Sequence, residues 1–464
     1  MRPSNSLEPG KMRHGWLISD EHEPMSAVLS FKAQSVTLTV LSDYSEPEGR
    51  WTGQLNPQTL KMAPIDLIFV DEKGTVELVE CLPRNRRGSG PGKRCEKWDF
   101  QPRFIVLGGN GRTWSTATTI ESYVPMLRKW LGENARRIGW DLSREDGDKW
   151  LEIDLKSDYS FHVDGALEHQ IITDSRTDSS QFGNGIHAFS ATRISTNFVA
   201  DHRDLALTEH TAILDFLTIV YGSRITYDTR IIKSLENPIR DINGKLIGPD
   251  FVHECELLSL QDQLNNSDGT PTHQNRALIS SSDPSRVLSQ WLKFWSDNRL
   301  GVKALTRAIS EQSSWENKLL NTAVAFEEFG YRLPGLTEYG TIANNFPIYI
   351  KRICLDMPKL AMSRPENWAR RFNLAYKGLK HADNKIPSIK EIAVTTQQGI
   401  AFLRAWCCFK VDPDTPIDNW YWNQQINYEE FYPKPTDINN SENWSALLPE
   451  SVILQEFSRL ERRN

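Results

Sequence analysis

The sequence predicts an α+β protein in which a β-rich, sandwich-like N-terminal part is followed by an all-α helical bundle. Up to about residue 230, apolar residues mostly recur at every second position, as in half-buried strands, whereas after residue 285 they recur with the period of 3.6 residues typical of helices. The intervening stretch, 265–285, is polar and rich in Ser, Asn, Pro and Gly. We therefore predict a β-rich domain at 1–263, a linker at 264–285, a helical domain at 286–410, and an aromatic-rich tail at 411–464 that packs on the bundle.

Composition limits the class of protein. A chain of 464 residues is too long for one ordinary core, and 39% hydrophobic with 25% charged residues is typical of a globular protein. We find no apolar run of the roughly 20 residues that a membrane helix needs, and no apolar secretory signal at the N-terminus. The six cysteines lack the spacing of a disulfide framework or a zinc site. We expect a cytoplasmic protein with no membrane partner, metal or cofactor; at net charge -6, any contact with nucleic acid must come from local basic patches.

The N-terminal part alternates strands with two helices. The segment 27–43 alternates apolar and polar residues, and 65–82 has the pattern of a hairpin turning at Asp71–Gly74. Further strands are predicted at 149–155, 161–166, 169–174 and 193–199. The two helices are predicted at 119–137 and at 208–222, where Thr208 is the expected cap and Gly222 the end.

The C-terminal part begins at Asp283-Pro284, a capping side chain before a proline at the first helical position. Helices are predicted at 286–298, 314–333, 341–356, 363–382 and 388–410. The fourth of these carries the only histidine after residue 273, His381.

The helix at 363–382 has an apolar face and a basic face. Ser363 and Glu366 have capping-box spacing, with Pro365 in the first turn. At 100° per residue, the core face is formed by Trp368, Phe372, Ala375 and Leu379, and the opposite stripe by Arg370, Lys377 and His381, flanked by Asn373 and Leu374. Two acidic residues oppose seven basic ones over 364–390, so this segment is cationic within an acidic protein.

These residue types suit cleavage of RNA by its own 2′-hydroxyl. A histidine transfers protons near neutral pH, and nearby cations bind and neutralise a phosphate, so no metal is needed. Lys377 lies one turn before His381 and could share a phosphate with it. Arg370 is about 16 Å away along the axis, a gap that a second copy across a two-fold axis could close. A cationic stripe opposite an apolar face is equally the ordinary pattern of a surface helix.

Several stretches in a fixed order resemble the ApeA family of bacterial anti-phage proteins, in which a β-rich ApeA domain precedes a helical HEPN domain. They are "GRWTGQL" to "IDLIFV", "ESYVPMLRKWLG", "ISTNFVADHRDLALTEHTAILDFLTIVYGSRITYDTRI", "VLSQWLKFW", "LLNTAVAFEEFGYRL", "LKHAD" and "GIAFLRAWCCFK". The resemblance covers about residues 14–410. It implies a homodimer formed through the helical domain, in which an Arg and a His of each protomer line a shared cleft where RNA is cut without metal. The implied outcome is abortive infection after a phage-derived activator is sensed, with cellular RNA as the target and tRNA as one candidate.

The chain matches the HEPN signature in part. The signature is an Arg, a gap of four to six residues and a His; His381 and the following Ala-Asp fit, but the nearest arginine, Arg371, precedes His381 by ten positions. Three alternatives stay open: Lys377 replaces the arginine, Arg371 reaches the site through an irregularity near Gly378, or the site is inactive.

The resemblance assigns His381, Arg371 and Lys377 as catalytic residues, and Arg370, Asn373, Lys380 and Asp383 as RNA-binding or orienting residues. The alternative function is a catalytically inactive HEPN scaffold that senses phage material or dimerises with a partner. Other candidates are weaker. The basic, glycine-rich stretch 84–97 could touch RNA or phage material, or be a disordered hairpin loop. His253 and Cys255 lack further ligands for a metal. Glu327-Glu328 could orient a basic group or be an ordinary helix-surface pair.

Overall fold

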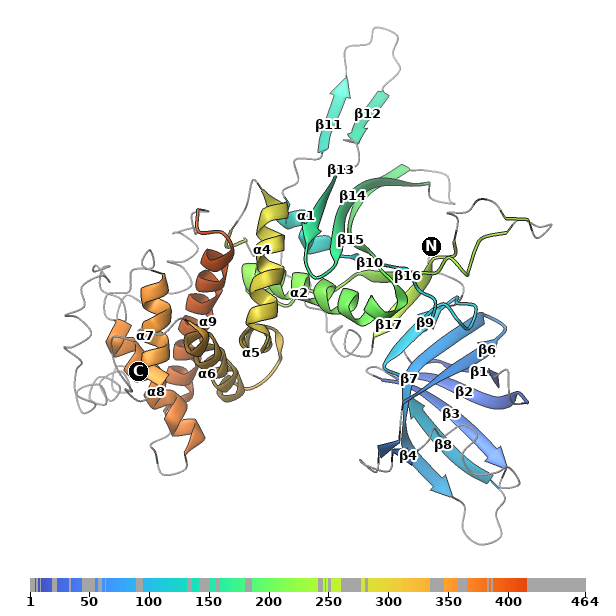
Figure 1. Ribbon diagram of the computed structural model, residues 1–464, viewed down its shortest axis with the longest axis horizontal. Helices are drawn as coiled ribbons and strands as arrows, with labels where there is room; N and C mark the ends of the chain where they lie inside the picture. Colours follow the sequence, from blue (N-terminus) through green and yellow to red (C-terminus); the bar gives the residue numbers. More distant parts are fainter. Residues whose placement is uncertain are drawn as a thin grey trace. The chain divides into compact units, whose positions relative to one another are not determined.

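The computed structural model describes residues 5, 7–8, 10–18, 23–32, 35–43, 55–56, 61–62, 64–88, 95–131, 136–141, 150–155, 159–179, 186–240, 245–246, 248, 252–259, 277–279, 283–333, 346–357, 365–381, 384 and 387–414. The chain is a mixed α+β protein (Figure 1). No helix in these ranges is both long enough and apolar enough to cross a membrane.

The strands are β1 (Met12–Ile18), β2 (Met25–Lys32), β3 (Ser35–Asp43), β4 (Leu55–Asn56), β5 (Lys61–Met62), β6 (Ile65–Asp71), β7 (Gly74–Gly88), β8 (Cys95–Gln101), β9 (Phe104–Leu107), β10 (Thr119–Tyr123), β11 (Arg136–Asp141), β12 (Trp150–Leu155), β13 (Tyr159–Asp164), β14 (Glu168–Ser179), β15 (Ile186–Asn197), β16 (Thr229–Lys233) and β17 (Cys255–Ser259). The helices are α1 (Pro125–Trp130), the short 3-10 helix η1 (Ala200–His202), α2 (Arg203–Tyr221), α4 (Pro284–Asp297), α5 (Arg299–Ser310), α6 (Trp315–Arg332), α7 (Phe346–Asp356), α8 (Pro365–Lys380) and α9 (Ile389–Val411). The chain divides into two compact units. The sheet unit comprises Met1–Arg128, Glu133–His210 and Thr226–Gly269; the helical unit comprises Lys129–Gly132, Thr211–Ile225 and Thr270–Asn464.

Six strands of the sheet unit close into an antiparallel barrel. Pairing runs β1–β2–β3–β8–β7–β6 and returns from β6 to β1. The 15-residue strand β7 makes the closure possible, because its N-terminal half pairs with β6 and its C-terminal half with β8. A barrel core of apolar side chains fills the interior, among them Leu17, Leu29, Leu38, Phe69 and Phe100. These six strands thus form a barrel rather than the predicted sandwich.

The same sheet continues beyond the barrel through β9, which pairs with β7. The order of this continuation is β9–β17–β16–β10–β15–β14–β13, all antiparallel. Ile105 and Leu107 of β9 belong to the barrel core, whereas Phe104 and Val106 belong to a second core with Ala206 of α2. Because successive side chains of a strand point to opposite faces, one four-residue strand contributes to both cores.

The predicted helix at 119–137 is wrong at both ends, since Arg136 and Arg137 lie in strand β11. Residues Thr119–Tyr123 form β10, which pairs on one side with β15 and on the other with β16. The helix α1 begins only at Pro125, a residue that is favoured at the first helical position because it has no N–H to donate. Strand pairing on both sides therefore overrides the helical spacing of the apolar residues.

Helix α2 starts earlier than predicted, at Arg203 instead of after Thr208, and ends before Gly222 as predicted. Gly222 has φ +63, the left-handed conformation that ends many helices. The C-terminal half of α2 belongs to the helical unit, where Trp291 Nε1 donates to Ala212 O (2.6 Å) and Arg404 Nε to Ile219 O (2.6 Å). These contacts explain why a helix from the β-rich part of the sequence packs with the C-terminal helices.

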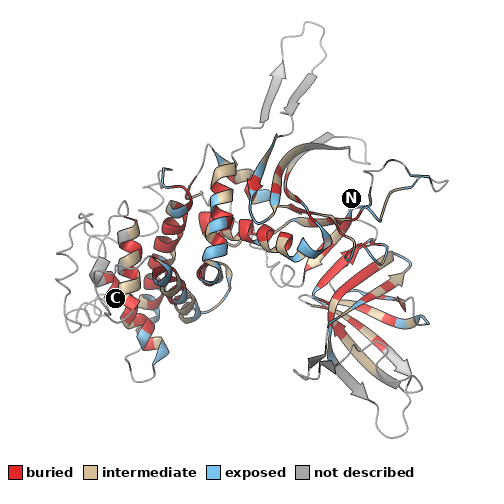
Figure 2. Cartoon of the chain, in the orientation of Figure 1, coloured by how far each residue is buried: buried red, intermediate tan, exposed pale blue. Residues whose placement is uncertain are grey.

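The helical unit has an aromatic core centred on Phe326 of α6. Its ring lies within 6.2 Å, centroid to centroid, of the rings of Phe346, Trp368, Phe372 and Phe402. Most of α9 is buried (Figure 2). The predicted helices correspond to α4 and α6–α9. Helix α5 was missed because it starts immediately after α4: Asn298 is both the C-cap of α4 and the N-cap of α5.

Several predicted features lie wholly or largely outside the described residues. They are Asp383, most of the linker 264–285, the tail beyond residue 414, and residues 89–94 of the basic stretch.

Candidate functional site

Helix α8 carries the candidate site and is anchored by its apolar face. Trp368, Phe372 and Ala375 are at most 1% exposed, as predicted for the core face, whereas Leu379, its fourth predicted member, is half-buried. Trp368 Nε1 donates to Gln398 Oε1 of α9 (3.0 Å), and Phe372 stacks on Phe346 of α7. These contacts fix the rotation of α8 about its axis and so decide which residues can reach solvent.

Two of the predicted site residues lie inside the helical unit. Arg371 is 8% exposed and Asn373 is 8% exposed. Arg370, by contrast, is half-buried. Burial of a charged guanidinium costs free energy unless the group is paired. Arg371 is therefore placed to interact with other groups of the helical unit and not with a ligand in solvent.

The two other basic residues and the histidine reach solvent at the C-terminal end of α8. Lys377, Lys380 and His381 are all exposed. His381 follows the last helical residue, and its N–H donates to Lys377 O (3.0 Å), which places the two residues one turn apart on one side of the helix. Cations at this position also interact favourably with the helix dipole.

Asn384 fixes the turn that holds His381. Its side-chain Nδ2 donates to Lys377 O (3.3 Å), and its backbone N–H donates to His381 O (3.2 Å). Sequence reasoning missed this residue, although an asparagine shortly after a helix is a recognised C-terminal signal. The imidazole is therefore presented by a hydrogen-bonded turn.

Lys380 is turned back onto the helix. Its Nζ donates to the Tyr376 hydroxyl (3.0 Å) and lies 5.0 Å from the centroid of that ring. This hydrogen bond and the charge interaction with Tyr376, with a smaller contribution from Glu327 of α6, raise the pKa of Lys380. Lys380 thus stays charged. Of the two adjacent glutamates, Glu327 contributes to this shift, and Glu328 pairs with Arg332 (2.5 Å).

The structure brings Lys377 and His381 together but not Arg371 and His381 within one chain. Arg371 precedes His381 by ten positions, which is about 15 Å along a helix. Helix α8 runs without interruption through Gly378 to Lys380, so no irregularity at Gly378 shortens this distance. Of the three alternatives, replacement of the arginine by Lys377 and an inactive site stay open.

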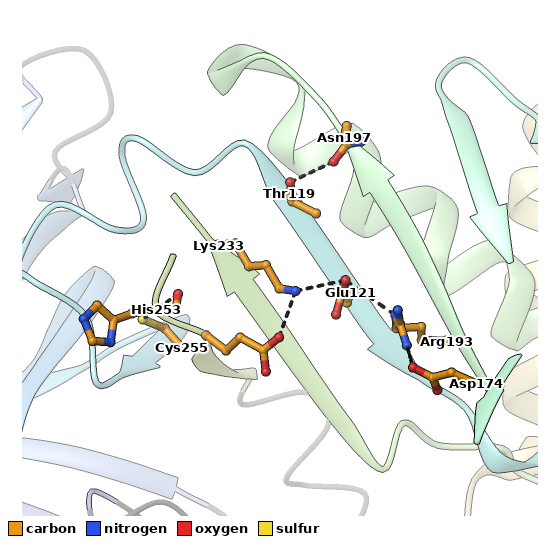
Figure 3. Close-up of polar contacts among 9 residues, drawn as sticks. Thr119, Glu121, Asp174, Arg193, Asn197, Lys233, His253 and Cys255 are labelled. Atoms are coloured by element: carbon orange, nitrogen blue, oxygen red, sulfur yellow. Dashed lines mark hydrogen bonds and ion pairs between the residues drawn. The ribbon is translucent and has the colours of Figure 1, made fainter. Parts of the chain in front are cut away.

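The sheet unit contains a separate polar constellation on the side of the sheet that carries Glu121 (Figure 3). Lys233 Nζ bridges Glu121 (3.1 Å) and Glu254 (2.9 Å), and Arg193 pairs with Glu121 (3.5 Å) and Asp174. The charges alternate in sign from strand to strand, so each is neutralised by its neighbours. This ladder stabilises strand pairing.

Cys255 lies on the opposite face of the sheet from the ladder, in the second core with Ile120 and Ile232, and is not arranged as a metal ligand. Burial raises the pKa of its thiol to about 11, and its Sγ contacts the His253 carbonyl oxygen (4.0 Å) instead of the ring. In the part of the chain that the structure describes, no three His, Cys, Asp or Glu side chains form a group that could hold a metal ion. No family model, curated protein or solved structure matches this chain.

Proposed function

We propose that this chain is a cytoplasmic anti-phage protein of the ApeA type whose helical part is a HEPN bundle acting as a metal-independent endoribonuclease. Its target is cellular RNA, with tRNA as one candidate, and its effect is abortive infection. It works as a homodimer through the helical part and responds to a phage-derived activator.

One observation carries the proposal: an exposed histidine, held by a hydrogen-bonded turn, stands one helical turn from an exposed lysine. His381 takes the proton of the 2′-hydroxyl or returns one to the 5′-oxygen that leaves. Lys377 binds the phosphate and stabilises the negative charge that develops on its oxygens. The bond from phosphorus to the 5′-oxygen breaks as the bond to the 2′-oxygen forms, which leaves a 2′,3′-cyclic phosphate and a 5′-hydroxyl.

The test compares the full chain with its His381→Ala variant on total RNA in EDTA. We expect cleavage by the wild type alone, with 2′,3′-cyclic phosphate ends. His14→Ala is the matched control, because His14 is also exposed but lies on β1 of the sheet unit. Cleavage that survives His381→Ala, or that needs a divalent metal, would refute the proposed site.

The burial of Arg371 favours a second candidate function, the catalytically inactive HEPN scaffold. An arginine that is 8% exposed and ten positions from the histidine is poorly placed to grip a phosphate in the same chain. A lysine binds phosphate as a point charge, without the two-pronged hydrogen bonding of arginine. Under the scaffold hypothesis, no RNA is cut in the presence of phage lysate, while the purified chain still self-associates or binds a phage component.

A further inference from the structure

Five side chains of the sheet unit form one continuous chain of hydrogen bonds, apart from the candidate site on α8. Ser122 belongs to β10, Thr196 to β15, His169 to β14, and Glu209 and His210 to α2. Ser122, His169 and His210 are 0% exposed, Thr196 is 1% exposed and Glu209 is 7% exposed. Only the Glu209 end approaches water.

The four links of this buried chain have good hydrogen-bond lengths. Ser122 Oγ lies 2.7 Å from His210 Nδ1, and His210 Nε2 lies 2.8 Å from Thr196 Oγ1. Thr196 Oγ1 lies 2.6 Å from His169 Nδ1, and His169 Nε2 lies 2.9 Å from Glu209 Oε2. Both nitrogens of both imidazoles are therefore used.

Glu209 fixes the direction of the last link. Burial opposes its ionisation, but hydrogen bonds from His169 and from the N–H groups of Ala166 (2.7 Å) and Leu167 (3.0 Å) outweigh this and lower the pKa of Glu209. A carboxylate has no hydrogen to donate, so His169 Nε2 carries one and donates it.

With His169 neutral, the remaining links follow one after another. His169 Nδ1 must accept, so the Thr196 hydroxyl donates to it. That hydroxyl has a single hydrogen, so it accepts from His210 Nε2. Burial lowers the pKa of His210 well below its usual value, and so do the charge of Arg230 and, once it is protonated, that of His169, so this ring is neutral and its Nδ1 accepts from Ser122. All four hydrogen bonds then point from Ser122 toward Glu209.

One additional proton on His169 reverses the other three links. Nδ1 becomes a donor to Thr196, whose hydroxyl turns to donate to His210 Nε2. His210 then loses its hydrogen from Nε2 and gains one on Nδ1, by exchange with water when this part of the unit opens locally, and donates it to Ser122 Oγ. The two states have the same four hydrogen bonds and differ by one proton taken up from water and by the tautomer of His210.

The surrounding charges favour His169 as the ring that takes the proton. Glu209 and His210 face it from α2, Val163 is its neighbour on β13, and β10 and β15 contribute the hydroxyls of the chain. At the other end, Arg230 of β16 is the cross-strand neighbour of Ser122 and lies on the same face. The carboxylate thus stands at the His169 end and the guanidinium at the His210 end, and the ring centroids, 5.6 Å apart, are too close for both rings to be charged.

We propose that this chain is a proton-driven tautomer switch, in which uptake of one proton at His169 changes the tautomer of His210 and releases the Ser122 hydroxyl from its acceptor. The switch is independent of the proposed ribonuclease activity. When the pH falls, protonation of His169 beside the Glu209 carboxylate exchanges donor and acceptor in the hydrogen bonds that join His210 of α2 to Thr196 and Ser122 of the sheet.

The test is a pH titration of the full chain labelled with ¹⁵N-histidine, followed by long-range ¹H–¹⁵N spectra that separate Nδ1 from Nε2. His169→Gln and His210→Gln assign the two rings. At pH 8 we expect both rings to carry hydrogen on Nε2 alone. On acidification His169 becomes doubly protonated, and over the same pH interval the His210 hydrogen moves completely to Nδ1.

Thr196 provides the matched pair of variants. Thr196→Val cuts the chain, so His169 should protonate while the His210 tautomer stays unchanged; Thr196→Ser keeps the hydroxyl and should keep the coupling. The wild-type titration decides the question even if Thr196→Val fails to fold. The proposal is overturned if wild-type His210 holds one tautomer while His169 protonates, if His210 carries hydrogen on Nδ1 at pH 8, or if neither ring changes before unfolding.

Discussion

The carboxylate of Glu77 organises the loop that connects the barrel to the second core. Glu77 is 4% exposed; its Oε1 accepts from the N–H groups of Gly111 (2.9 Å) and Thr113 (2.9 Å), and its Oε2 from that of Trp114 (2.8 Å). In Glu77→Gln, one oxygen becomes an NH₂ group that cannot accept, so at least one of these N–H groups is left without a partner. The remaining bonds lose their charge assistance as well. We expect the loop to be destabilised by about 3 kcal/mol.

Hydrogen–deuterium exchange measures this locally, because exchange of the three loop amides reports the free energy of local opening. A loss of about 3 kcal/mol corresponds to roughly 100-fold faster exchange. Glu80→Gln is the matched control on the same strand, since the Glu80 carboxylate pairs with Arg103, whose side chain is 57% exposed. Such exposed pairs contribute at most about 1 kcal/mol. Equal exchange at residues 111–114 in the two variants would refute the role given to Glu77.

Three further predictions follow from other parts of the chain. Gly399→Ala on α9 should lower the melting temperature by the equivalent of about 1–3 kcal/mol, because the added Cβ would lie 2.6 Å from Phe372; a higher melting temperature, as helix propensity alone suggests, would contradict this packing. Burial keeps the pKa of His210 below its unfolded value, so the free energy of unfolding should fall by up to about 1.4 kcal/mol per pH unit as pH drops below 6.5, and His210→Gln should remove this slope in urea titrations. Lys377→Ala should reduce the salt dependence of RNA binding by a slope of roughly 0.7, whereas Lys293→Ala, another exposed lysine, should not; equal slopes would place the RNA elsewhere.

Periodicity predicted the elements whose neighbours are close in sequence. The hairpin around Asp71–Gly74 and the core face of α8 follow from local rules, since turn residues and one apolar stripe are enough to specify them. The segment Thr119–Tyr123 was misassigned because its apolar spacing suits a helix, while its true state depends on pairing with β15 and β16, which lie far away in the sequence. Closure of the barrel likewise depends on β7 changing partners, which no local pattern reveals.

In the candidate site too, the features that depend on local spacing were predicted, and those that depend on packing between distant segments were not. Exposure of Lys377 and His381 followed from their place opposite the apolar stripe of α8. Burial of Arg371 could not be predicted from this spacing. Arg371 is rotated by about 100° about the helix axis from Phe372, and its surroundings depend on how α8 packs against α7 and α9. The buried chain through His169 and His210 escaped sequence reasoning entirely, since its members are drawn from four elements whose order along the chain gives no hint of contact.

Burial separates the histidines of this protein by role. His381 is exposed and has the exposed Lys377 one turn away, so its environment suits exchange of protons with water and with a bound substrate. His169 and His210 are sealed, and each nitrogen has a fixed partner, so their environment suits storing one proton and a defined tautomer. One substitution at each site distinguishes the two roles. His381→Ala should abolish RNA cleavage and leave the acid unfolding profile unchanged, whereas His169→Gln should alter that profile and leave cleavage at neutral pH intact. If His169→Gln abolished cleavage without affecting stability, the separation of roles would fail.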